Sequence, residues 1–371
     1  MIVGTVTETK AQEYRVGLTP DCVKSFAMRG HTVLYQRGAG EQAGFEDREY
    51  AAAGAEVVAD ARSIYERAEM IVKVKEPLPS EYELLREDQI LFTYLHLAAS
   101  RDLTDALLRR KIKGVAYETI ETPERSLPCL KPMSEIAGRL SIQEGAKYLE
   151  RTYGGRGVLL GGVPGVQRGK VTIIGGGVVG TNACKVAVGM GAEVTILDVN
   201  SDRLAYLDDI FSTHITTLYS TDSNIERVLP ESDLVIGAVL LPGERAPRLV
   251  NRAHIASMKK GAVIVDVAVD QGGCIETTHP TTHDDPVFVV DGVVHYCVAN
   301  MPGAVALSST QALTSATLPY GLSIAEHGLE KACRASSAIH RGVNVYAGKC
   351  VHPGVARTFG IDWTPLDDIL E

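Results

Sequence analysis

The sequence predicts an α/β protein with two doubly wound domains, and three observations support this fold class. Short β-rich apolar runs alternate with helix-length segments along most of the chain, a pattern typical of parallel sheets packed with helices. The chain has 371 residues, whereas a single hydrophobic core stops growing at about 250 to 300 residues. A glycine-rich βαβ pattern stands between residues 171 and 198.

The expected elements fall into two series. The first series contains strands at residues 3–6, 32–35, 70–74, 90–95 and 115–117, with helices at 21–29 and 80–85. The second contains strands at residues 171–174, 194–197, 215–218, 234–239, 263–269 and 294–298. Each series is long enough for one doubly wound sheet.

The boundary between the domains is expected near a long segment without interior proline, residues 133–151, which suits a joining helix with Ser134 near its N-terminus. Residues 305–371 carry helical patterns but no series of strands, so we expect them to return and cover the first sheet. The predicted domains are therefore residues 1–130 plus 305–371, and residues 131–304. A cleft between them is expected to hold ligands.

The glycine-rich pattern is Gly175-x-Gly177-x-x-Gly180, placed between a β-branched run and a helical pattern. In a Rossmann dinucleotide-binding unit, the first glycine permits a tight turn, the second lets the backbone approach a pyrophosphate, and the third allows close packing of helix on strand. A glycine-rich turn in an ordinary α/β fold is the alternative reading. The flanking strand and helix favour the dinucleotide-binding unit.

The second strand of this unit ends in Asp198, about 20 residues after the glycines. A carboxylate there can accept hydrogen bonds from the adenosine ribose hydroxyls and would repel the 2′-phosphate of NADP. Arg203, one helical turn further on, is the only nearby cation that could offset this repulsion. Asp198 therefore predicts NAD as the cofactor.

Composition excludes several classes of function. No apolar stretch reaches the about 18 residues of a membrane span, and a net charge of −9 without a basic run argues against a nucleic-acid partner. The N-terminal residues lack the pattern of a signal peptide, so a cytoplasmic location is expected. The 7 cysteines have no metal-ligand spacing and are expected to be reduced thiols.

Charged residues at the ends of apolar strands are the candidates for chemistry, because ligands of open α/β sheets bind beyond the carboxyl ends of the strands. Lys75, His96 and Asp270 each end an apolar run. Arg15 lies in the loop after the first strand, before the helix start at Thr19-Pro20. For each of these residues, a solvated or structural role is the alternative. Asp266 lies inside its strand and is expected to be structural.

These four side chains supply the groups that a nicotinamide enzyme acting on a small acid requires. Arg15 can bind a carboxylate through two hydrogen bonds, and Lys75 can polarise a carbonyl oxygen. His96 titrates near neutrality and can move protons, and Asp270 can stabilise a cationic intermediate. This combination predicts an oxidoreductase.

Six segments resemble the alanine dehydrogenase family, which includes the NAD(H)-binding component of proton-translocating transhydrogenase, and the resemblance covers essentially the whole chain. They are TETKAQEYRVGLTP (7–20), VKVKEP (72–77), FTYLHLAA (92–99), PMSEIAGR (132–139), GGVPGV (161–166) and VDVAVDQGGCIE (265–276). The resemblance implies substrate binding by Arg15 and Lys75, catalysis by His96 and Asp270, and a homohexamer.

The resemblance also implies contacts to NAD beyond the glycines. These are Ser134, Val178, Asp198, Arg203, Ser220, Val239, Leu240, Val267, Ala268, Val269, Asp270, Val298, Ala299, Asn300 and Met301. His279 stands where many members of the family carry arginine, so a cofactor contact there is left out. Some members hold magnesium at the residues that match Glu118 and His327; packing or a crystallisation ion is the alternative, since two such ligands are few.

The expected reaction is the NAD-dependent oxidative deamination of L-alanine to pyruvate and ammonia, which is reversible. Two alternatives remain open. One is a non-catalytic NAD(H)-binding subunit of the transhydrogenase type. The other is a related dehydrogenase of another small amino acid, because the sequence does not reveal the side-chain specificity.

Overall fold

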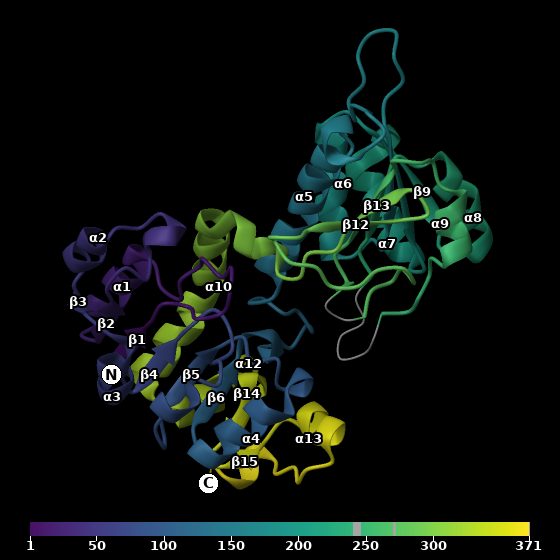
Figure 1. Ribbon diagram of the computed structural model, residues 1–371. Coiled ribbons are helices and arrows are strands. Elements are labelled where there is room, and N and C mark those ends of the chain that lie inside the picture. Colours follow the sequence, from purple (N-terminus) through teal and green to yellow (C-terminus); the bar gives the residue numbers. More distant parts are fainter. Residues whose placement is uncertain (240–245, 270–271, 371) are drawn as a thin grey trace. The chain divides into compact units, whose positions relative to one another are not determined.

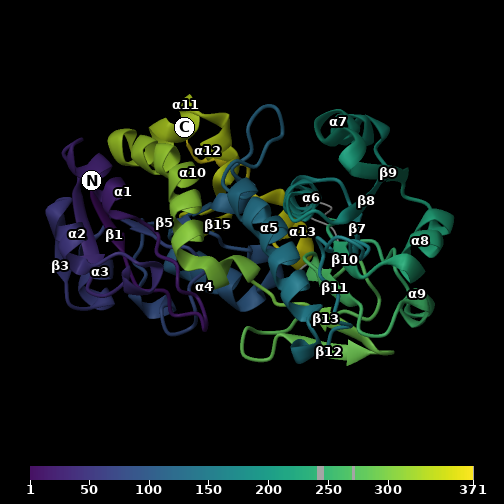
Figure 2. The same cartoon turned by 90° about the horizontal axis from the view of Figure 1, so that it is seen from above.

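The computed structural model describes residues 1–239, 246–269 and 272–370. They form two compact units (Figures 1 and 2): unit 1 is Met1–Met133 with Gly303–Glu371, and unit 2 is Ser134–Pro302. The sequence places the domain junctions after residues 130 and 304, close to these two points. Each unit contains one sheet packed with helices, so the α/β fold class is confirmed.

Unit 1 is built on an eight-stranded sheet with the order β15-β14-β6-β5-β4-β1-β2-β3. The strands from β1 to β6 pair in parallel, whereas β14 and β15 join the β6 edge in antiparallel orientation. The strands are β1 (Ile2–Thr5), β2 (Thr32–Gln36), β3 (Ala55–Val58), β4 (Met70–Val72), β5 (Ile90–Thr93), β6 (Lys113–Ala116), β14 (Val343–Tyr346) and β15 (Lys349–Cys350).

The helices of unit 1 come from both parts of the chain. They are α1 (Pro20–Ala27), α2 (Asp47–Ala52), α3 (Ala61–Arg67), α4 (Arg101–Arg110), α10 (Ala306–His327), α11 (Leu329–Ala335), α12 (Ser337–Gly342) and α13 (Pro353–Phe359). Thr19 caps α1 through its hydroxyl, and Pro20 occupies the first turn, as the sequence predicts. Helix α10 lies on the sheet, where a Cβ on Gly321 would lie 3.3 Å from the Phe92 ring.

Three predictions about unit 1 were wrong. Residues 305–371 do contribute strands. The polar residue Asn344 in β14 can be buried because its amide donates to the Thr119 hydroxyl at 2.7 Å. Strand β3 was missed because this short edge strand has only one fully buried residue. Residues 80–85 contain only the 3-10 turn Tyr82–Leu84, because Glu81 accepts the Leu78 N–H and holds the chain in a turn.

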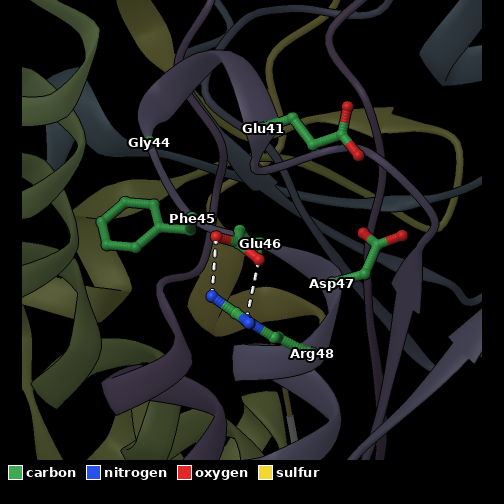
Figure 3. Close-up of a pocket in the computed structure, with 6 residues that line it drawn as sticks. All are labelled: Glu41, Gly44, Phe45, Glu46, Asp47 and Arg48. Carbon is green, nitrogen blue, oxygen red and sulfur yellow. Dashed lines mark hydrogen bonds and ion pairs between the residues drawn. The ribbon is translucent and has the colours of Figure 1, made fainter.

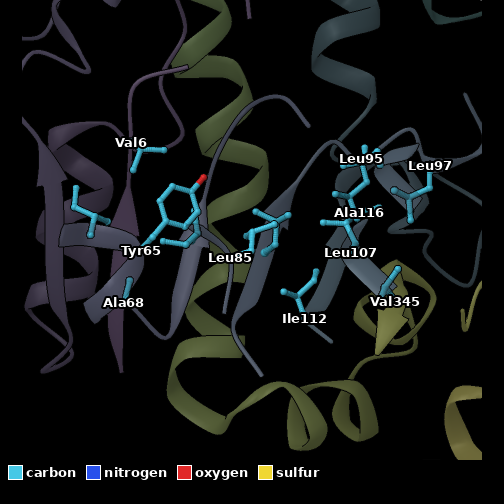
Figure 4. Packing of buried hydrophobic residues seen from close by; sticks show 14 of the residues in the cluster. Val6, Tyr65, Ala68, Leu85, Leu95, Leu97, Leu107, Ile112, Ala116 and Val345 are labelled. Carbon is cyan, nitrogen blue, oxygen red and sulfur yellow. The ribbon is translucent and has the colours of Figure 1, made fainter. Parts of the chain in front are cut away.

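The returning segment forms part of the core of unit 1 (Figure 4). Buried side chains from the N-terminal part, such as Leu91 and Leu107, share one hydrophobic cluster with Val345 and Val355 from the returning part. The two parts of the chain therefore bury apolar surface against one another, and we expect neither to fold without the other.

Unit 2 is built on a seven-stranded sheet with the order β12-β13-β11-β10-β7-β8-β9, in which only β12 is antiparallel. Strand β12 was not predicted. The strands are β7 (Lys170–Ile174), β8 (Glu193–Asp198), β9 (Ile215–Tyr219), β10 (Leu234–Gly237), β11 (Val263–Asp266), β12 (Val287–Val290) and β13 (Val293–Tyr296). The helices are α5 (Lys131–Tyr148), α6 (Val178–Gly189), α7 (Ser201–Phe211), α8 (Asp222–Val228) and α9 (Arg252–Ser257).

The six parallel strands of both sheets follow the same Rossmann order. Unit 1 has β3-β2-β1-β4-β5-β6 and unit 2 has β9-β8-β7-β10-β11-β13. The strand order therefore reverses between β1 and β4 in unit 1 and between β7 and β10 in unit 2. Ligands of such sheets bind beyond the carboxyl ends of the strands at this reversal.

Residues 154–169 form an extended loop on unit 2 (Figure 1). It exposes three apolar side chains, Leu159, Val163 and Val166, each more than half accessible. Within the described ranges, no helix is long and apolar enough to span a membrane.

Leu107→Ala is expected to lower the free energy of unfolding by about 2 to 5 kcal/mol, because Leu107 is fully buried in the unit 1 core. Met28→Ala is the matched control, since Met28 is 77% exposed, and should change stability by about 0.5 kcal/mol or less. Urea unfolding followed by circular dichroism measures both. Equal losses for the two variants would contradict this assignment of the core.

Candidate active site

Arg15 lies in the loop that follows β1, and its guanidinium is held by a carboxylate two residues earlier. Its Nε donates to Glu13 Oε1 and its Nη2 to Glu13 Oε2, both at 2.6 Å. Its Nη1 lies 2.9 Å from the sulfur of Met133. Only 2% of the Arg15 side chain is exposed, and none of the Glu13 side chain. This pair is therefore a buried, two-point ion pair at the end of the sheet.

Lys75 lies beyond the end of β4, in a segment that a second buried carboxylate fixes. Glu8 accepts the backbone N–H of Val74 at 2.6 Å and that of Lys75 at 3.3 Å. Burial lowers the pKa of Lys75, and the nearby positive charge of Arg15 lowers it further. The two predicted substrate-binding cations are therefore close enough to repel one another.

Lys73, the first residue after β4, anchors this segment through buried ion pairs. Its ammonium is fully buried and forms ion pairs with Glu8 at 3.3 Å and Glu81 at 2.8 Å. The hydroxyls of Tyr65 and Thr9 donate to Glu81 at 3.0 and 2.6 Å. Because every charge in this group has a partner, the group can stay buried and hold the backbone that carries Lys75.

His96 follows β5 and has a left-handed backbone with φ of 47°, which is uncommon for a residue other than glycine. Glu118 stabilises this conformation by accepting the His96 N–H at 2.6 Å and the Leu95 N–H at 3.2 Å. The imidazole stacks on Tyr94 with ring centroids 5.7 Å apart, and 45% of the side chain is exposed. His96 is thus held in place while its ring remains accessible.

Three predicted residues are brought to one edge of the unit 1 sheet. Arg15, Lys75 and His96 follow β1, β4 and β5, which are adjacent in the sheet. The ring of Tyr94 stacks on His96. Burial raises the pKa of the Tyr94 hydroxyl, and the nearby positive charge of Arg15 opposes this rise. The fourth predicted residue, Asp270, lies outside the described residues.

Glu118 and His327, the predicted magnesium ligands, contact different residues. Glu118 follows the carboxyl end of β6, where its carboxylate accepts backbone N–H groups. His327 ends α10 beside Glu326, which pairs with Arg29 just before the start of β2. No group of three or more metal-binding side chains exists among the described residues. The magnesium site therefore stays a prediction.

The glycine loop of unit 2 has the conformation that phosphate binding requires. Gly175 has φ of 104°, which side chains disfavour. A Cβ on Gly180 would overlap the carbonyl oxygen of Gly175, whereas a Cβ on Gly177 would meet no atom within 4 Å. Helix α6 begins at Val178, so its free N–H groups and positive dipole end face the loop. This open space beside backbone N–H groups fits a dinucleotide pyrophosphate.

Asp198 and Arg203 surround the same loop. Asp198 accepts the N–H of Gly176 at 2.6 Å and that of Asn200 at 2.8 Å. A carboxylate has about four acceptor positions, so room remains for ribose hydroxyls. Arg203 donates from Nε to the Gly176 carbonyl oxygen at 2.5 Å. The Ser220 hydroxyl is buried without a hydrogen-bond partner in the described part of the chain, as expected of a group that binds a polar ligand.

The other predicted cofactor residues follow the carboxyl ends of neighbouring strands. Val239 follows β10, residues 267–269 follow β11, and residues 298–301 follow β13. Ser134 lies in the first turn of α5. Leu240 lies outside the described residues. His279 is exposed and stacks on Phe288 with ring centroids 3.9 Å apart.

Asp266 has the structural role that the sequence predicts. It accepts hydrogen bonds from the Thr278 hydroxyl at 2.7 Å and from the Ala268 N–H at 3.1 Å. Burial raises its pKa, and these hydrogen bonds oppose the rise. It thereby fixes the backbone of residues 267–269, which belong to the predicted cofactor site.

A surface cavity beside α2 is not part of this site (Figure 3). It is lined by Glu41, Gly44, Phe45, Glu46, Asp47 and Arg48. Its one cation, Arg48, is paired with Glu46 at 2.7 Å. The cavity has neither a glycine loop nor any of the predicted catalytic residues.

The sequence did not reveal the carboxylates that hold the predicted residues, namely Glu8 and Glu13, nor this role of Glu118. An acidic residue in a polar loop looks the same in sequence whether it is solvated or buried. The spacing Glu13-x-Arg15 was an available signal, but the exposed pair Glu46-x-Arg48 has the same spacing. Only burial distinguishes the two pairs.

Comparisons with known proteins agree with this geometry. The chain matches the descriptions "Alanine dehydrogenase/PNT, N-terminal domain" at residues 4–137 and "Alanine dehydrogenase/PNT, C-terminal domain" at residues 141–353. It is 55% identical over 371 residues to alanine dehydrogenase of Methanococcus maripaludis and 54% identical over 372 residues to that of Staphylococcus haemolyticus, with 100% of each chain covered.

Two solved structures are also similar. One named L-alanine dehydrogenase has a TM-score of 0.95 and 56% identity, covering 97% of this chain and 99% of that chain. Transhydrogenase from Sinorhizobium meliloti has a TM-score of 0.80 and 26% identity, covering 95% and 99%. The chain therefore belongs to the alanine dehydrogenase/PNT family, as its six sequence motifs predict.

Proposed function

We propose that this chain catalyses the NAD-dependent oxidative deamination of L-alanine to pyruvate and ammonia, and the reverse reductive amination of pyruvate. The observation that carries the proposal is the placement of Arg15, Lys75 and His96 at the ends of three adjacent strands. The full-length relatives named alanine dehydrogenase support the same reaction.

Arg15 and Lys75 bind the substrate in this proposal. The guanidinium of Arg15 holds the carboxylate that alanine and pyruvate share. The ammonium of Lys75 assists and polarises the carbonyl oxygen of pyruvate. Because the buried surroundings keep water from competing, both interactions are stronger than they would be at an exposed surface.

His96 and Asp270 carry the proton transfers. NAD⁺, when bound, accepts a hydride from the substrate carbon that carries the amine. His96 removes a proton from the water that attacks the resulting iminium carbon, and its accessible ring suits this role. Asp270 stabilises the cationic amine and iminium. Loss of ammonia then gives pyruvate, and the same groups act in reverse during reductive amination.

The glycine loop and the strand ends of unit 2 hold the cofactor. Gly175, Gly177 and Gly180 supply the pyrophosphate site, and Asp198 accepts from the ribose hydroxyls. The remaining contacts are assigned to Ser134, Val178, Arg203, Ser220, Val239, Leu240, Val267, Ala268, Val269, Asp270, Val298, Ala299, Asn300 and Met301.

The assembly and location are part of the proposal. A homohexamer is supported by the family resemblance, and the exposed Leu159, Val163 and Val166 are apolar surface that an assembly would cover. A cytoplasmic location is supported by the seven cysteines, all of which are free thiols.

A panel of L-amino acids tests the reaction against its alternatives. Spectrophotometric assays of NADH formation should give the highest kcat/KM with L-alanine. The absence of NADH formation with every amino acid would favour a non-catalytic NAD(H)-binding subunit. A clear preference for a side chain larger than methyl would instead indicate a related dehydrogenase.

His96→Ala should lower kcat by a factor of about 10² to 10⁴, the usual contribution of a positioned acid or base. Fluorescence titration should still detect NADH binding, because His96 belongs to unit 1 and the glycine loop to unit 2. His214→Ala is the matched control, since His214 is exposed in the 3-10 turn Ser212–His214 and has no part in the proposed site. Near wild-type turnover in His96→Ala would exclude the proposed role.

Lys75→Arg tests the charge at the substrate site. The lowered pKa of Lys75 means that its ammonium is lost at a lower pH than in an ordinary lysine. The KM for pyruvate should therefore rise as the pH increases through the alkaline range. In Lys75→Arg the KM should vary less over the same range, because guanidinium stays charged. Parallel pH profiles for the two proteins would show that Lys75 does not bind the substrate as a cation.

A further inference from the structure

Glu13 meets Arg15 through more contacts than charge neutralisation requires. Its Oε1 accepts the side-chain Nε at 2.6 Å and also the backbone N–H of Arg15 at 3.1 Å, while its Oε2 accepts Nη2 at 2.6 Å. One carboxylate therefore fixes both the backbone and the plane of the guanidinium of the same residue. These two parallel hydrogen bonds prevent the guanidinium plane from rotating.

Glu46 and Arg48 form a comparable pair on the surface (Figure 3). They have the same spacing, and Arg48 likewise reaches both carboxylate oxygens, Nε at 2.7 Å from Oε2 and Nη2 at 3.0 Å from Oε1. The side chains are 80% and 61% exposed, however, against 2% and 0% for Arg15 and Glu13. The spacing alone thus allows this ion pair to form. Burial increases the free-energy cost of losing one partner, because water cannot replace it at a buried site.

The outer edge of the Arg15 guanidinium has a different environment. Nη1 lies 2.9 Å from the thioether sulfur of Met133, which is a weak hydrogen-bond acceptor. A carboxylate is a far stronger acceptor and can displace such a contact. The two side-chain hydrogen bonds of Glu13 thus lie on the Nε–Nη2 edge of Arg15, and the contact with Met133 lies on Nη1.

We propose that Glu13 is a positioning residue for substrate binding: it clamps the Nε–Nη2 edge of Arg15 and so fixes the plane in which the guanidinium meets the substrate carboxylate. This inference rests on the proposed function, because it takes Arg15 to be the carboxylate-binding residue. Glu13 itself touches no substrate atom. The carboxylate of the substrate is bound in both the ground state and the transition state, so the effect belongs mainly in KM.

Glu13→Gln tests this role. The amide can accept one of the two side-chain hydrogen bonds but presents an NH₂ group to the other donor. The KM for pyruvate should rise about 10-fold to 100-fold, since a misplacement of about 1 Å can cost a factor of about 100. The KM for NADH should not change, and kcat should change less than the KM for pyruvate. Glu46→Gln, the matched control at the same spacing, should leave all three unchanged.

Two further variants separate positioning from folding. Glu13→Asp keeps the charge but shortens the reach, so its KM for pyruvate should lie between those of the wild type and Glu13→Gln. In an Arg15→Lys background, Glu13→Gln should have little further effect on this KM, because an ammonium has no plane to orient. Circular dichroism and NADH binding verify that each variant is folded.

The outcomes distinguish this inference from the proposed function. If Arg15→Lys leaves the KM for pyruvate unchanged, Arg15 does not bind the substrate and the proposed function loses its carboxylate site. If Arg15→Lys raises that KM but Glu13→Gln and Glu13→Asp leave it unchanged or lower it, only the positioning role of Glu13 is overturned. If Glu13→Gln changes the KM for pyruvate by the same factor in the wild type and in the Arg15→Lys background, the positioning role is also overturned.

Discussion

Pairing of buried charges is the constraint on which the substrate side of this protein depends. Arg15 and Lys73 are almost completely buried, and an unpaired charge at such a depth would cost several kcal/mol. Glu13 and Glu8 neutralise them at hydrogen-bond distance. Because both carboxylates belong to the loop after β1, that loop cannot shift without separating a buried ion pair. The positions of the candidate substrate-binding groups therefore follow from the requirement that no buried charge be left alone.

The strand order then determines where these pairs lie. In unit 1 the chain returns from β3 to the opposite side of β1, so the loops after β1 and β4 stand at the reversal of the strand order, where ligands of such sheets bind. Arg15 belongs to the first loop and Lys75 to the second. Unit 2 repeats the same order with β7 and β10, and there the glycine loop and Val239 occupy the corresponding places.

Much of this arrangement could be predicted from the sequence, and the failures have physical causes. Apolar runs ending in Lys75 and His96 indicated strand ends, because burial and polarity change abruptly there. The role of Glu13 could not be predicted, since the burial of its ion pair with Arg15 depends on residues far along the chain, such as Met133, which contacts Arg15. Strand β14 was missed because Asn344 interrupts its apolar pattern, and only the folded structure supplies the partner of that amide.

The loop after the first strand occupies the same topological position in both sheets, yet the two loops offer an anion different groups. In unit 2, the glycines leave main-chain N–H groups and the positive end of the α6 dipole for the proposed pyrophosphate site. In unit 1, the equivalent loop offers the charged side chain of Arg15 to the proposed substrate carboxylate, and a second side chain, Glu13, holds the first. Substitutions should therefore be tolerated differently. A side chain at Gly175 or Gly180 would strain or clash with the backbone of the glycine loop, whereas the unit 1 site can change its ligand through substitutions that leave its backbone intact.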